Sequence, residues 1–338
     1  MKIIDLRSDT VTRPCPAMRS AMAQADVGDD VFAEDPTVNR LEKMAADMLG
    51  FESALFASSG TQTNLLALLS HCQRGDEYIV GQQAHTYRYE GGGAAVLGSI
   101  QPQPIEFEPD STLDLAKVKR YIKPDDFHCA RTRLLCLENT QAGKALPMHY
   151  LASAASFAKD EGLQIHLDGA RIFNAALKRN VSAAVIATYF DSVSLCLSKG
   201  LGAPVGSLLC ASSELIREAR KWRKMLGGGM RQAGILAAAG IFALAHNRQR
   251  LAEDHENAAL LAQGLSDIDE IAVDFHEAQT NMVYVDFPSE SAALLPEFLQ
   301  QRGILVSGGA KVRLVTHLDV AEEDIQRVVE AYKEFFSG

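Results

Sequence analysis

The fold of this chain is decided by the stretch Ser192-Val193-Ser194-Leu195-Cys196-Leu197-Ser198-Lys199-Gly200-Leu201-Gly202. Residues 192–197 predict a buried β-strand that runs into Lys199 and a glycine. Burial disfavours the charged form of an amine, and an uncharged amine can attack carbonyl compounds. The alternative is a lysine that turns out to solvent, which is the more common arrangement for a lone lysine at a strand end. Partner residues elsewhere in the chain have to decide between the two.

A second strand, predicted over 163–167, provides the first such partner. Its alternate apolar residues share one face, and Asp168 falls at the carboxyl end on the opposite face. Ligands of open α/β sheets bind outside the carboxyl ends of the strands, so Asp168 and Lys199 are candidates for one site. By itself, an aspartate such as Asp168 at a strand end is more often a helix cap or a turn residue.

A second partner is the tripeptide Ser59-Gly60-Thr61, which follows the short strand 54–57 and opens a predicted helix. Free N–H groups and the helix dipole favour an anion at such a position. The Walker lysine pattern is absent, which argues against a nucleotide-binding loop. A phosphate site, an aspartate for a pyridine nitrogen and a Schiff-base lysine together describe a holder for pyridoxal 5'-phosphate.

Strands and helices alternate around these motifs. Further strands are predicted at 77–80, 134–137 and 207–211, which favours a mostly parallel sheet with helices on both faces. We expect three parts: an N-terminal arm over 1–15, too polar for a core strand; a large cofactor-binding domain over 16–250; and a small α+β domain over 251–338. One continuous helix over 234–265 is predicted to connect the last two. The small domain is predicted to have strands at 280–287, 303–307 and 311–316 and a closing helix at 322–336.

Composition limits the possible partners. The chain has 338 residues and a formal net charge of −10, which argues against nucleic acid or an anionic membrane as a partner. Its six cysteines include no CxxC pair and no metal-ligand spacing, so no metal site is predicted and a reducing, cytoplasmic location is expected. The N-terminus reaches charged residues at once and has no apolar signal core.

Five motifs stand in order along the chain: Asp5-Leu6-Arg7-Ser8-Asp9-Thr10-Val11-Thr12, Val27-Gly28-Asp29-Asp30-Val31, His166-Leu167-Asp168-Gly169-Ala170-Arg171, Leu197-Ser198-Lys199-Gly200-Leu201-Gly202 and Arg313-Leu314-Val315-Thr316-His317-Leu318. With them, the chain closely resembles the low-specificity L-threonine aldolases over essentially its full length. These are pyridoxal-phosphate enzymes of fold type I, the aspartate-aminotransferase-like fold.

The resemblance implies an α/β fold with a large, mostly parallel sheet of the seven-stranded type, flanked by helices, and a smaller C-terminal α+β domain. It implies cleavage of L-threonine, L-allo-threonine or both to glycine and acetaldehyde. It also implies a homo-oligomer, a tetramer built as a dimer of dimers, with active sites shared across the dimer interface.

Matched residue by residue, the resemblance makes Lys199 the lysine that holds the cofactor and Asp168 the partner of its ring nitrogen, with His85 stacked on the ring. Cofactor binding falls to Gly60, Thr61, His85, Asp168, Arg171, Lys199, Lys224 and Arg231, of which Lys224 and Arg231 would reach the phosphate of a neighbouring subunit. Substrate binding falls to Ser8, Tyr87, His128, Arg171 and Arg313. His85 and His128 are the candidate bases for the β-hydroxyl proton, and the sequence does not rank them.

The chain departs from the family pattern in one loop. Gln141 and Ala142 stand where the family commonly has a His-Asn pair, which leaves the role of this loop open. The alternatives are another fold-type-I enzyme, such as a β-lyase, a transaminase or a serine hydroxymethyltransferase, and a cofactor-free binding protein that keeps the fold. A nicotinamide-dependent oxidoreductase is disfavoured because the glycine fingerprint is missing.

Overall fold

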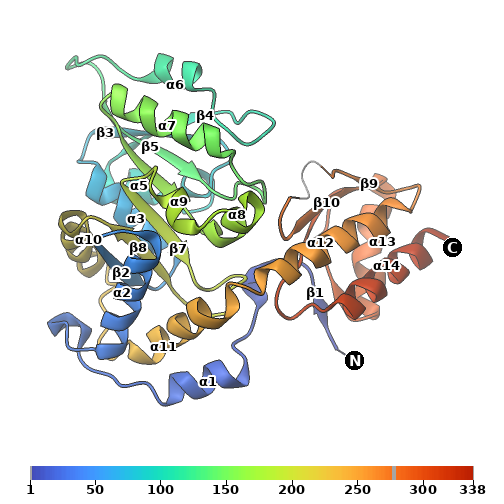
Figure 1. Ribbon diagram of the computed structural model, residues 1–338. Coiled ribbons are helices and arrows are strands. Elements are labelled where there is room, and N and C mark those ends of the chain that lie inside the picture. The colour runs from blue at the N-terminus through green and yellow to red at the C-terminus, as the bar shows by residue number, and fades with distance from the viewer. Residues whose placement is uncertain (1, 276–278, 338) are drawn as a thin grey trace.

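The computed structural model describes residues 2–275 and 279–337. Its larger body is built on a seven-stranded sheet of order β2-β8-β7-β6-β5-β3-β4 (Figure 1). Only β8 runs antiparallel to its neighbours in this sheet, so the mostly parallel α/β fold is confirmed. The strands are β2 (Ser53–Ala57), β3 (Asp76–Gly81), β4 (Gln101–Ile105), β5 (Arg131–Glu138), β6 (Gln164–Asp168), β7 (Ser192–Cys196) and β8 (Ser207–Ala211).

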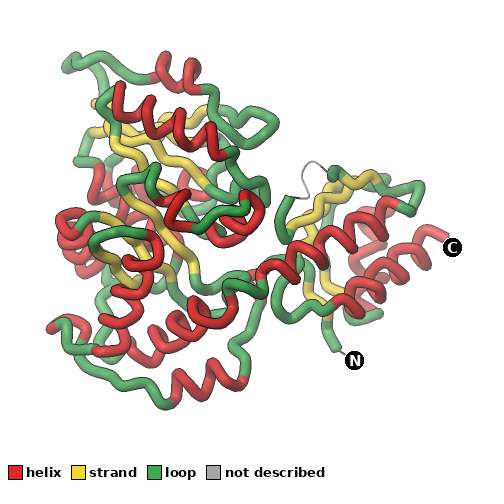
Figure 2. Tube along the Cα trace, viewed as in Figure 1, coloured by secondary structure: helices red, strands yellow, loops and turns green. Residues whose placement is uncertain are grey.

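Helices cover both faces of this sheet, as Figure 2 shows. On β5, Leu135 and Leu137 pack in one core with α2, α7, α8, α9 and α11, whereas Leu134 and Cys136 pack on the other face with α3 and α5. The alternation follows from the two-residue period of a strand. The helices are α1 (Pro16–Ala23), α2 (Pro36–Leu49), α3 (Gly60–His71), α4 (His85–Arg88), α5 (Gly93–Gly98), α6 (Leu115–Tyr121), α7 (Met148–Asp160), α8 (Ile172–Arg179), α9 (Ala183–Ala187), α10 (Ser213–Met225) and α11 (Gly234–Phe242).

Strand β4 is absent from the sequence-based prediction. It contains Pro102 and Pro104, which have no N–H to donate to a ladder. The structure places it at the edge of the sheet, paired only with β3. Proline is tolerated at such an edge because one side of the strand needs no partner.

The long helix predicted over 234–265 is wrong in its middle. The chain forms α11, a π-helical turn η3 (Ala243–Asn247), a short non-helical step, and then α12 (Leu251–Ser266). At the break, the Asn247 side chain donates to the carbonyl of Leu201 at 2.7 Å, and the Arg248 Nε donates to the carbonyl of Leu244 at 2.5 Å. Side-chain bonds to backbone groups compete with the helical ladder, so an apolar period alone could not reveal the break.

The smaller body lies at the end of α12 (Figure 1). It has its own hydrophobic core, to which α12 contributes Ala258, Leu261 and Leu265. Its strands β12, β10 and β9 form an antiparallel sheet, and β1 pairs in parallel with β11. The elements are β1 (Ile4–Asp5), β9 (Ala272–Val273), β10 (Met282–Asp286), α13 (Ser289–Gln301), β11 (Ile304–Leu305), β12 (Lys311–Val315) and α14 (Glu322–Ser337).

The N-terminal arm is part of this second core, and the expectation that it is too polar for a core strand is wrong. Ile4 and Leu6 are fully buried there, whereas Asp5 and Arg7 alternate with them and pair with each other. A two-residue period can therefore bury half of a polar-looking segment. Within residues 2–275 and 279–337, no helix combines the length and the apolar character needed to cross a membrane.

Candidate active site

The candidate site lies where the carboxyl ends of β5, β6 and β7 meet the first turns of α3. Asp168 is the last residue of β6, and it lies opposite Glu138, the last residue of β5. Lys199 follows β7 in a turn that is closed by the Gly202 N–H and the Thr12 hydroxyl, both of which donate to the Lys199 carbonyl. The Lys199 residue is half-buried. The charges of Asp168 and Lys199 both act on Glu138, so the two predicted partners share one electrostatic environment.

Asp168 is held by two donors. Its Oδ1 accepts the Ala170 N–H at 3.0 Å, and its Oδ2 accepts the side-chain amide of Asn64 at 2.8 Å. Asn64 lies on α3 and is itself fixed by the Ser194 hydroxyl, which donates to its Oδ1 at 2.5 Å. The carboxylate is 2% exposed and has a set orientation, which suits a partner for a ring nitrogen.

A histidine and a second carboxylate complete this cluster. His85 Nδ1 lies 2.8 Å from Glu90 Oε1, and the same oxygen accepts the Asn64 amide at 2.8 Å. One ring nitrogen of His85 and one carboxylate oxygen each of Glu90 and Asp168 all lie within 4.8 Å of one another. The Asn64 amide donates to both carboxylates, which offsets their mutual repulsion. The sequence analysis missed Asn64 and Glu90.

The cluster shifts the acidity of its members. Burial and the neighbouring Asp168 charge raise the pKa of Glu138 to about 7. The hydrogen bond with Glu90 raises the pKa of His85 above its ordinary value, and burial raises the pKa of Glu90. Perturbed groups that cluster at the carboxyl edge of a sheet are typical of a catalytic site.

The first turn of α3 provides the predicted anion site. The Ser59 hydroxyl accepts the Gln62 N–H at 3.2 Å, and the first bond of the helix runs from Thr63 N–H to the Ser59 carbonyl. The N–H groups of Gly60 and Thr61 come before this bond in the chain, so they have no acceptor within the helix. They can therefore donate to a bound anion. A Cβ at position 60 would lie 2.6 Å from Cys196 Sγ, so glycine is required for the helix to approach β7 this closely.

Arg171 already has a carboxylate partner. Its Nε and Nη2 donate to the two oxygens of Asp9, each at 2.7 Å. The pair is buried, with side-chain exposures of 12% and 1%. Burial by itself would raise the pKa of Asp9, but Arg171, with help from the Lys199 charge, lowers it to about 2. The pair leaves Nη1 of Arg171 unused.

The arm also brings Ser8 and Arg313 to the same region. Ser8 caps the short 3₁₀ turn η1 (Asp9–Val11), where its hydroxyl oxygen accepts the Thr10 N–H at 3.2 Å. Arg313 extends from β12, and its Nη2 donates to the carbonyl of Arg7 at 3.3 Å. An exposed guanidinium therefore lies directly beside Ser8.

Three predicted residues lie outside this cluster, and a fourth, Tyr87, belongs to the same short helix as His85. His128 lies in an exposed loop before β5, at the amino end of the strand, and contacts Asp126. Lys224 is exposed near the end of α10, and Arg231 pairs with Asp29 at 2.9 Å. Tyr87 on α4 packs against the core shared by α3 and α5. Within one chain, the residues that the structure describes do not bring His128 to Lys199.

The loop that departs from the family pattern forms a tight turn. Gln141 and Lys144 exchange backbone hydrogen bonds, and the buried Gln141 lies with its side-chain nitrogen 3.5 Å from the carbonyl of Gln83. Ala142 at the tip is exposed and adopts the left-handed conformation, with a φ of 49°. This conformation costs an alanine roughly 1 kcal/mol, whereas asparagine tolerates it.

A second polar network runs from Asn64 away from the cluster. Ser192 Oγ lies 2.7 Å from His71 Nε2 and 2.8 Å from His166 Nδ1, and His166 Nε2 lies 3.3 Å from Asn64 Oδ1. Burial lowers the pKa of His71 to about 4 and that of His166 to about 3, so both imidazoles are neutral near pH 7. Polar residues inside otherwise apolar strands were the only sequence signal for this network.

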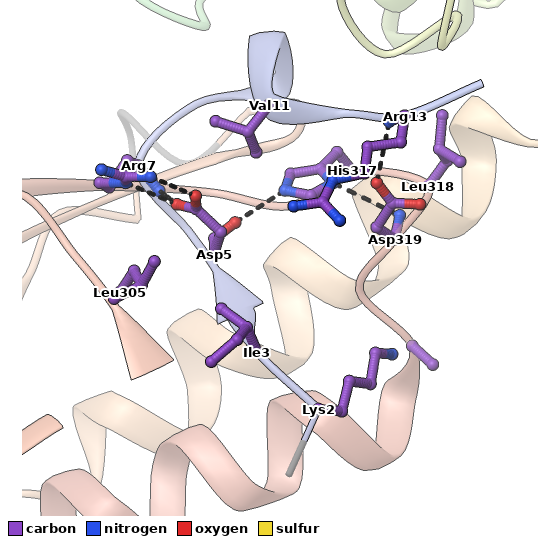
Figure 3. A pocket seen from close by; sticks show the side chains of 11 residues that line it. Lys2, Ile3, Asp5, Arg7, Val11, Arg13, Leu305, His317, Leu318 and Asp319 are labelled. Atoms are coloured by element: carbon purple, nitrogen blue, oxygen red, sulfur yellow. Dashed lines mark hydrogen bonds and ion pairs between the residues drawn. The ribbon is translucent and has the colours of Figure 1, made fainter. Parts of the chain in front are cut away.

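A cavity of about 880 Å³ is lined by residues of the N-terminal arm and of the smaller body, among them Asp5, Arg13 and His317 (Figure 3). Asp5 pairs with Arg7 there, and the Arg13 N–H donates to Asp319 at 3.1 Å. None of its 11 lining residues belongs to the cluster around Asp168 and Lys199. The cavity therefore belongs to the joint between the arm and the smaller body.

Comparison with known proteins supplies the family. The profile of the beta-eliminating lyase family matches residues 5–288. The low specificity L-threonine aldolase of Escherichia coli K12 is 55% identical over 335 residues, which cover 99% of this chain and 100% of that protein. Low-specificity L-threonine aldolase 1 of Arabidopsis thaliana is 42% identical, with 99% and 96% covered.

Solved structures agree at the level of the fold. The threonine aldolase of Leishmania major superposes with a TM-score of 0.84 at 22% identity and covers 98% of this chain and 99% of its own. The serine palmitoyltransferase of Sphingomonas wittichii reaches 0.77 at 19% identity, with 98% and 86% covered. The fold is thus shared by proteins with different names, and the family follows from the close sequence relatives. This chain belongs to the low-specificity L-threonine aldolases, within the beta-eliminating lyase family.

Proposed function

We propose that the protein is a pyridoxal-phosphate-dependent aldolase, a carbon–carbon lyase that cleaves L-threonine, L-allo-threonine or both to glycine and acetaldehyde. The observation that carries the proposal is the meeting of Asp168, Lys199 and the α3 N-terminus at one edge of the sheet. Identity of 55% over the full length of a low specificity L-threonine aldolase supports the same reaction.

The residues present fit the cofactor. Lys199 offers an amine, Asp168 offers an oriented carboxylate for the ring nitrogen, and Gly60 and Thr61 offer N–H groups for the phosphate. When bound, pyridoxal phosphate takes up the electron pair of the breaking Cα–Cβ bond. His85, 42% exposed at its side chain and beside Asp168, is suited to contact the ring.

The arm and the smaller body supply the substrate's carboxylate site. Arg313 and Ser8 would donate to the carboxylate, and Arg171 would add Nη1 while Asp9 holds the rest of its guanidinium. A carboxylate held on one side turns the Cα–Cβ bond toward the cofactor, and such orientation lowers a barrier by several kcal/mol. Tyr87 is proposed to contact the substrate's β-substituent.

A base must remove the β-hydroxyl proton. His85 lies in the cluster of this chain, whereas His128 could act only from another copy of the chain. The proposed cleavage needs an imidazole that can accept this proton, and histidine is the side chain suited to that task near neutral pH.

We further propose a cytoplasmic homotetramer built as a dimer of dimers. Lys224 and Arg231 are surface cations outside the cluster, and they would reach the cofactor phosphate of the partner subunit. His128 would reach a neighbouring site in the same way. No nucleic acid or membrane partner is proposed, in line with the net charge of −10.

The test is a steady-state comparison of L-threonine, L-allo-threonine and their D-isomers, with acetaldehyde detected directly. Acetaldehyde from an L-isomer, without added keto acid or folate, supports the aldolase and separates it from a transaminase or a serine hydroxymethyltransferase. Lys199→Ala should remove turnover while the circular-dichroism spectrum stays unchanged. Substantial cleavage by this variant would refute the role of Lys199.

A further inference from the structure

We propose that Glu90 is the positioning residue that holds the His85 ring with Nδ1 protonated, so that Nε2 is the atom that accepts the substrate's hydroxyl proton. The proposal rests on the proposed aldol cleavage and deepens it. It assigns the base function to one nitrogen of His85 and a supporting function to Glu90, which no motif of the sequence identified.

The hydrogen-bonding capacity of the two groups carries the argument. His85 Nδ1 and Glu90 Oε1 are 2.8 Å apart. An ionised carboxylate can only accept, and a neutral imidazole has one N–H, so Nδ1 must carry that hydrogen. The lone pair then lies on Nε2. The Glu90 side chain is 4% exposed and that of His85 is 42% exposed, so the imidazole is bonded to a buried carboxylate while part of its surface stays accessible.

Glu90 is itself immobilised, so it can impose an orientation. Its Oε1 accepts the Asn64 amide at 2.8 Å, and Asn64 is locked by Asp168 and by the Ser194 hydroxyl. The His85 backbone is also held, because its N–H donates to Glu138 Oε2 at 2.8 Å. The imidazole therefore has a fixed backbone and a fixed inner nitrogen.

The charged groups that face His85 come from four separate places in the chain. Glu90 follows α4, Glu138 ends β5, Asp168 ends β6, and Lys199 follows β7. Asp168 already accepts hydrogens from Asn64 and Ala170, whereas Glu90 bonds to the ring itself. In agreement with this geometry, the Glu90 hydrogen bond is the largest influence on the pKa of His85 and raises it.

The proton step balances. The hydroxyl O–H bond breaks, a bond from Nε2 to hydrogen forms, and the oxygen's electron pair becomes the second bond of the aldehyde carbonyl as Cα–Cβ breaks. The imidazole gains a positive charge, which the adjacent Glu90 carboxylate stabilises. A carboxylate behind a histidine base performs the same two tasks, orientation and charge compensation, in hydrolytic triads.

The first test reads the tautomer directly. Nitrogen-15 spectra of labelled histidine, with the His85 signals assigned by their absence in His85→Asn, are recorded across pH with and without pyridoxal phosphate. Above its pKa, His85 of the wild type should carry its proton on Nδ1. In Glu90→Gln, the His85 titration should move to lower pH, because the hydrogen bond that raises the pKa of His85 loses its charged acceptor. A wild-type Nε2–H tautomer, or an unmoved titration in the variant, would overturn the proposal.

The second test measures catalysis. In Glu90→Gln, kcat should fall by about tenfold or more while the absorbance of bound cofactor and KM change little. Glu90→Asp should retain more activity than Glu90→Gln because it keeps the charge. Glu323→Gln, which neutralises an exposed carboxylate in the first turn of α14, is the control. Equal kcat in Glu90→Gln and the control would also overturn the proposal.

Together, the two tests distinguish a failure of the proposed function from a failure of the role proposed for Glu90. If the wild type releases no acetaldehyde, the proposed function fails, whereas the tautomer and titration of His85 still decide whether Glu90 positions the ring. If acetaldehyde is released but the tautomer is wrong, only the positioning role of Glu90 is refuted.

Discussion

At the residue scale, Asp9 shows how a residue of the arm fixes the orientation of a guanidinium of the larger body. The two carboxylate oxygens of Asp9 accept hydrogen bonds from Nε and Nη2 of Arg171, each at 2.7 Å. These two bonds fix the orientation of the guanidinium. Arg313, by contrast, is exposed and bonds only to the carbonyl of Arg7 among the described contacts. The two arginines predicted to bind the substrate carboxylate therefore differ: Arg171 is held by Asp9, whereas the side chain of Arg313 is exposed.

The Asp9–Arg171 pair predicts a pH-dependent stability. Because the folded pKa of Asp9 is lowered to about 2, its contribution is present above the ordinary pKa near 4 and is lost as pH falls from about 4 to about 2. Asp9→Asn should cost about 3 kcal/mol at pH 7 in urea unfolding. The difference in unfolding free energy between wild type and Asp9→Asn should become smaller by about 2 kcal/mol as the pH falls from about 4 to about 2.

The matched control is Asp47→Asn, which removes an exposed partner of Lys43. Its effect should stay small at all pH values because surface pairs contribute little. A gap between wild type and Asp9→Asn that stays constant with pH would contradict the linkage.

Arg313→Leu should weaken substrate binding more than cofactor binding. Loss of a charged hydrogen bond to a carboxylate should raise KM by roughly 10- to 100-fold. The visible absorbance of bound pyridoxal phosphate should be unchanged, because Arg313 lies beside Ser8 in the arm and not at α3. Loss of the cofactor from this variant would show that Arg313 has a different role.

At the element scale, the chain departs from regular structure where it serves the site. The π-helical turn η3 lets Asn247 reach the Leu201 carbonyl, two residues beyond Lys199, so the break in the long helix supports the lysine turn. The left-handed Ala142 closes the turn that keeps Gln141 buried against the backbone of Gln83. At η3, a hydrogen bond from the Asn247 side chain accompanies the break in the helix. At Ala142, the backbone hydrogen bonds between Gln141 and Lys144 accompany the left-handed conformation.

Ala142→Asn is predicted to stabilise the protein. The residue is exposed and has a φ of 49°, and asparagine accepts this conformation at lower cost than alanine. The free energy of unfolding should rise by about 0.5 kcal/mol, as measured by urea titration. Ala142→Val, which is β-branched, should lower it. The reverse order of the two variants would mean that the turn is not left-handed.

At the scale of the whole molecule, two bodies and the N-terminal arm contribute residues to the proposed site. The larger body would supply the cofactor residues, and the smaller body would supply Arg313. The arm joins them, since β1 pairs with β11 while Asp9 and Thr12 reach Arg171 and the Lys199 turn. Truncating the arm would therefore remove contacts from both halves at once.

The proposed sharing of sites across a dimer predicts complementation. Lys199→Ala and Arg231→Ala should each have low activity alone. If one site uses Lys199 of one subunit and Arg231 of its partner, subunit exchange creates hybrids with one intact site. Such a mixture should recover up to about a quarter of wild-type activity. Recovery is followed by acetaldehyde release after mild unfolding and refolding of the mixture, with each variant treated separately as the control. No recovery would indicate that both residues serve the same chain.

Several of the strongest sequence predictions concern features encoded locally. Asp35 caps α2 by accepting the Thr37 and Val38 N–H groups, and Gly50 ends the helix with a φ of 80°, in line with the capping preferences of these residue types. The strand-to-turn positions of Asp168 and Lys199 follow from apolar runs with a polar end. β4 was missed because two prolines erase the strand pattern, and an edge position is a property of the sheet and not of the segment.

The sequence by itself therefore determined the α/β class and the family, and it predicted Lys199, Asp168 and the turn at Gly60 as site residues. These depend on periodicity, capping and turn chemistry, which act over a few residues, and on motifs that stand in order. Only the tertiary structure decided that Asn64 lies between Asp168 and Glu90, that Glu90 supports His85, and that Asp9 engages Arg171. Those contacts join side chains from separate elements or across a turn, and packing brings them together where no local pattern can specify them.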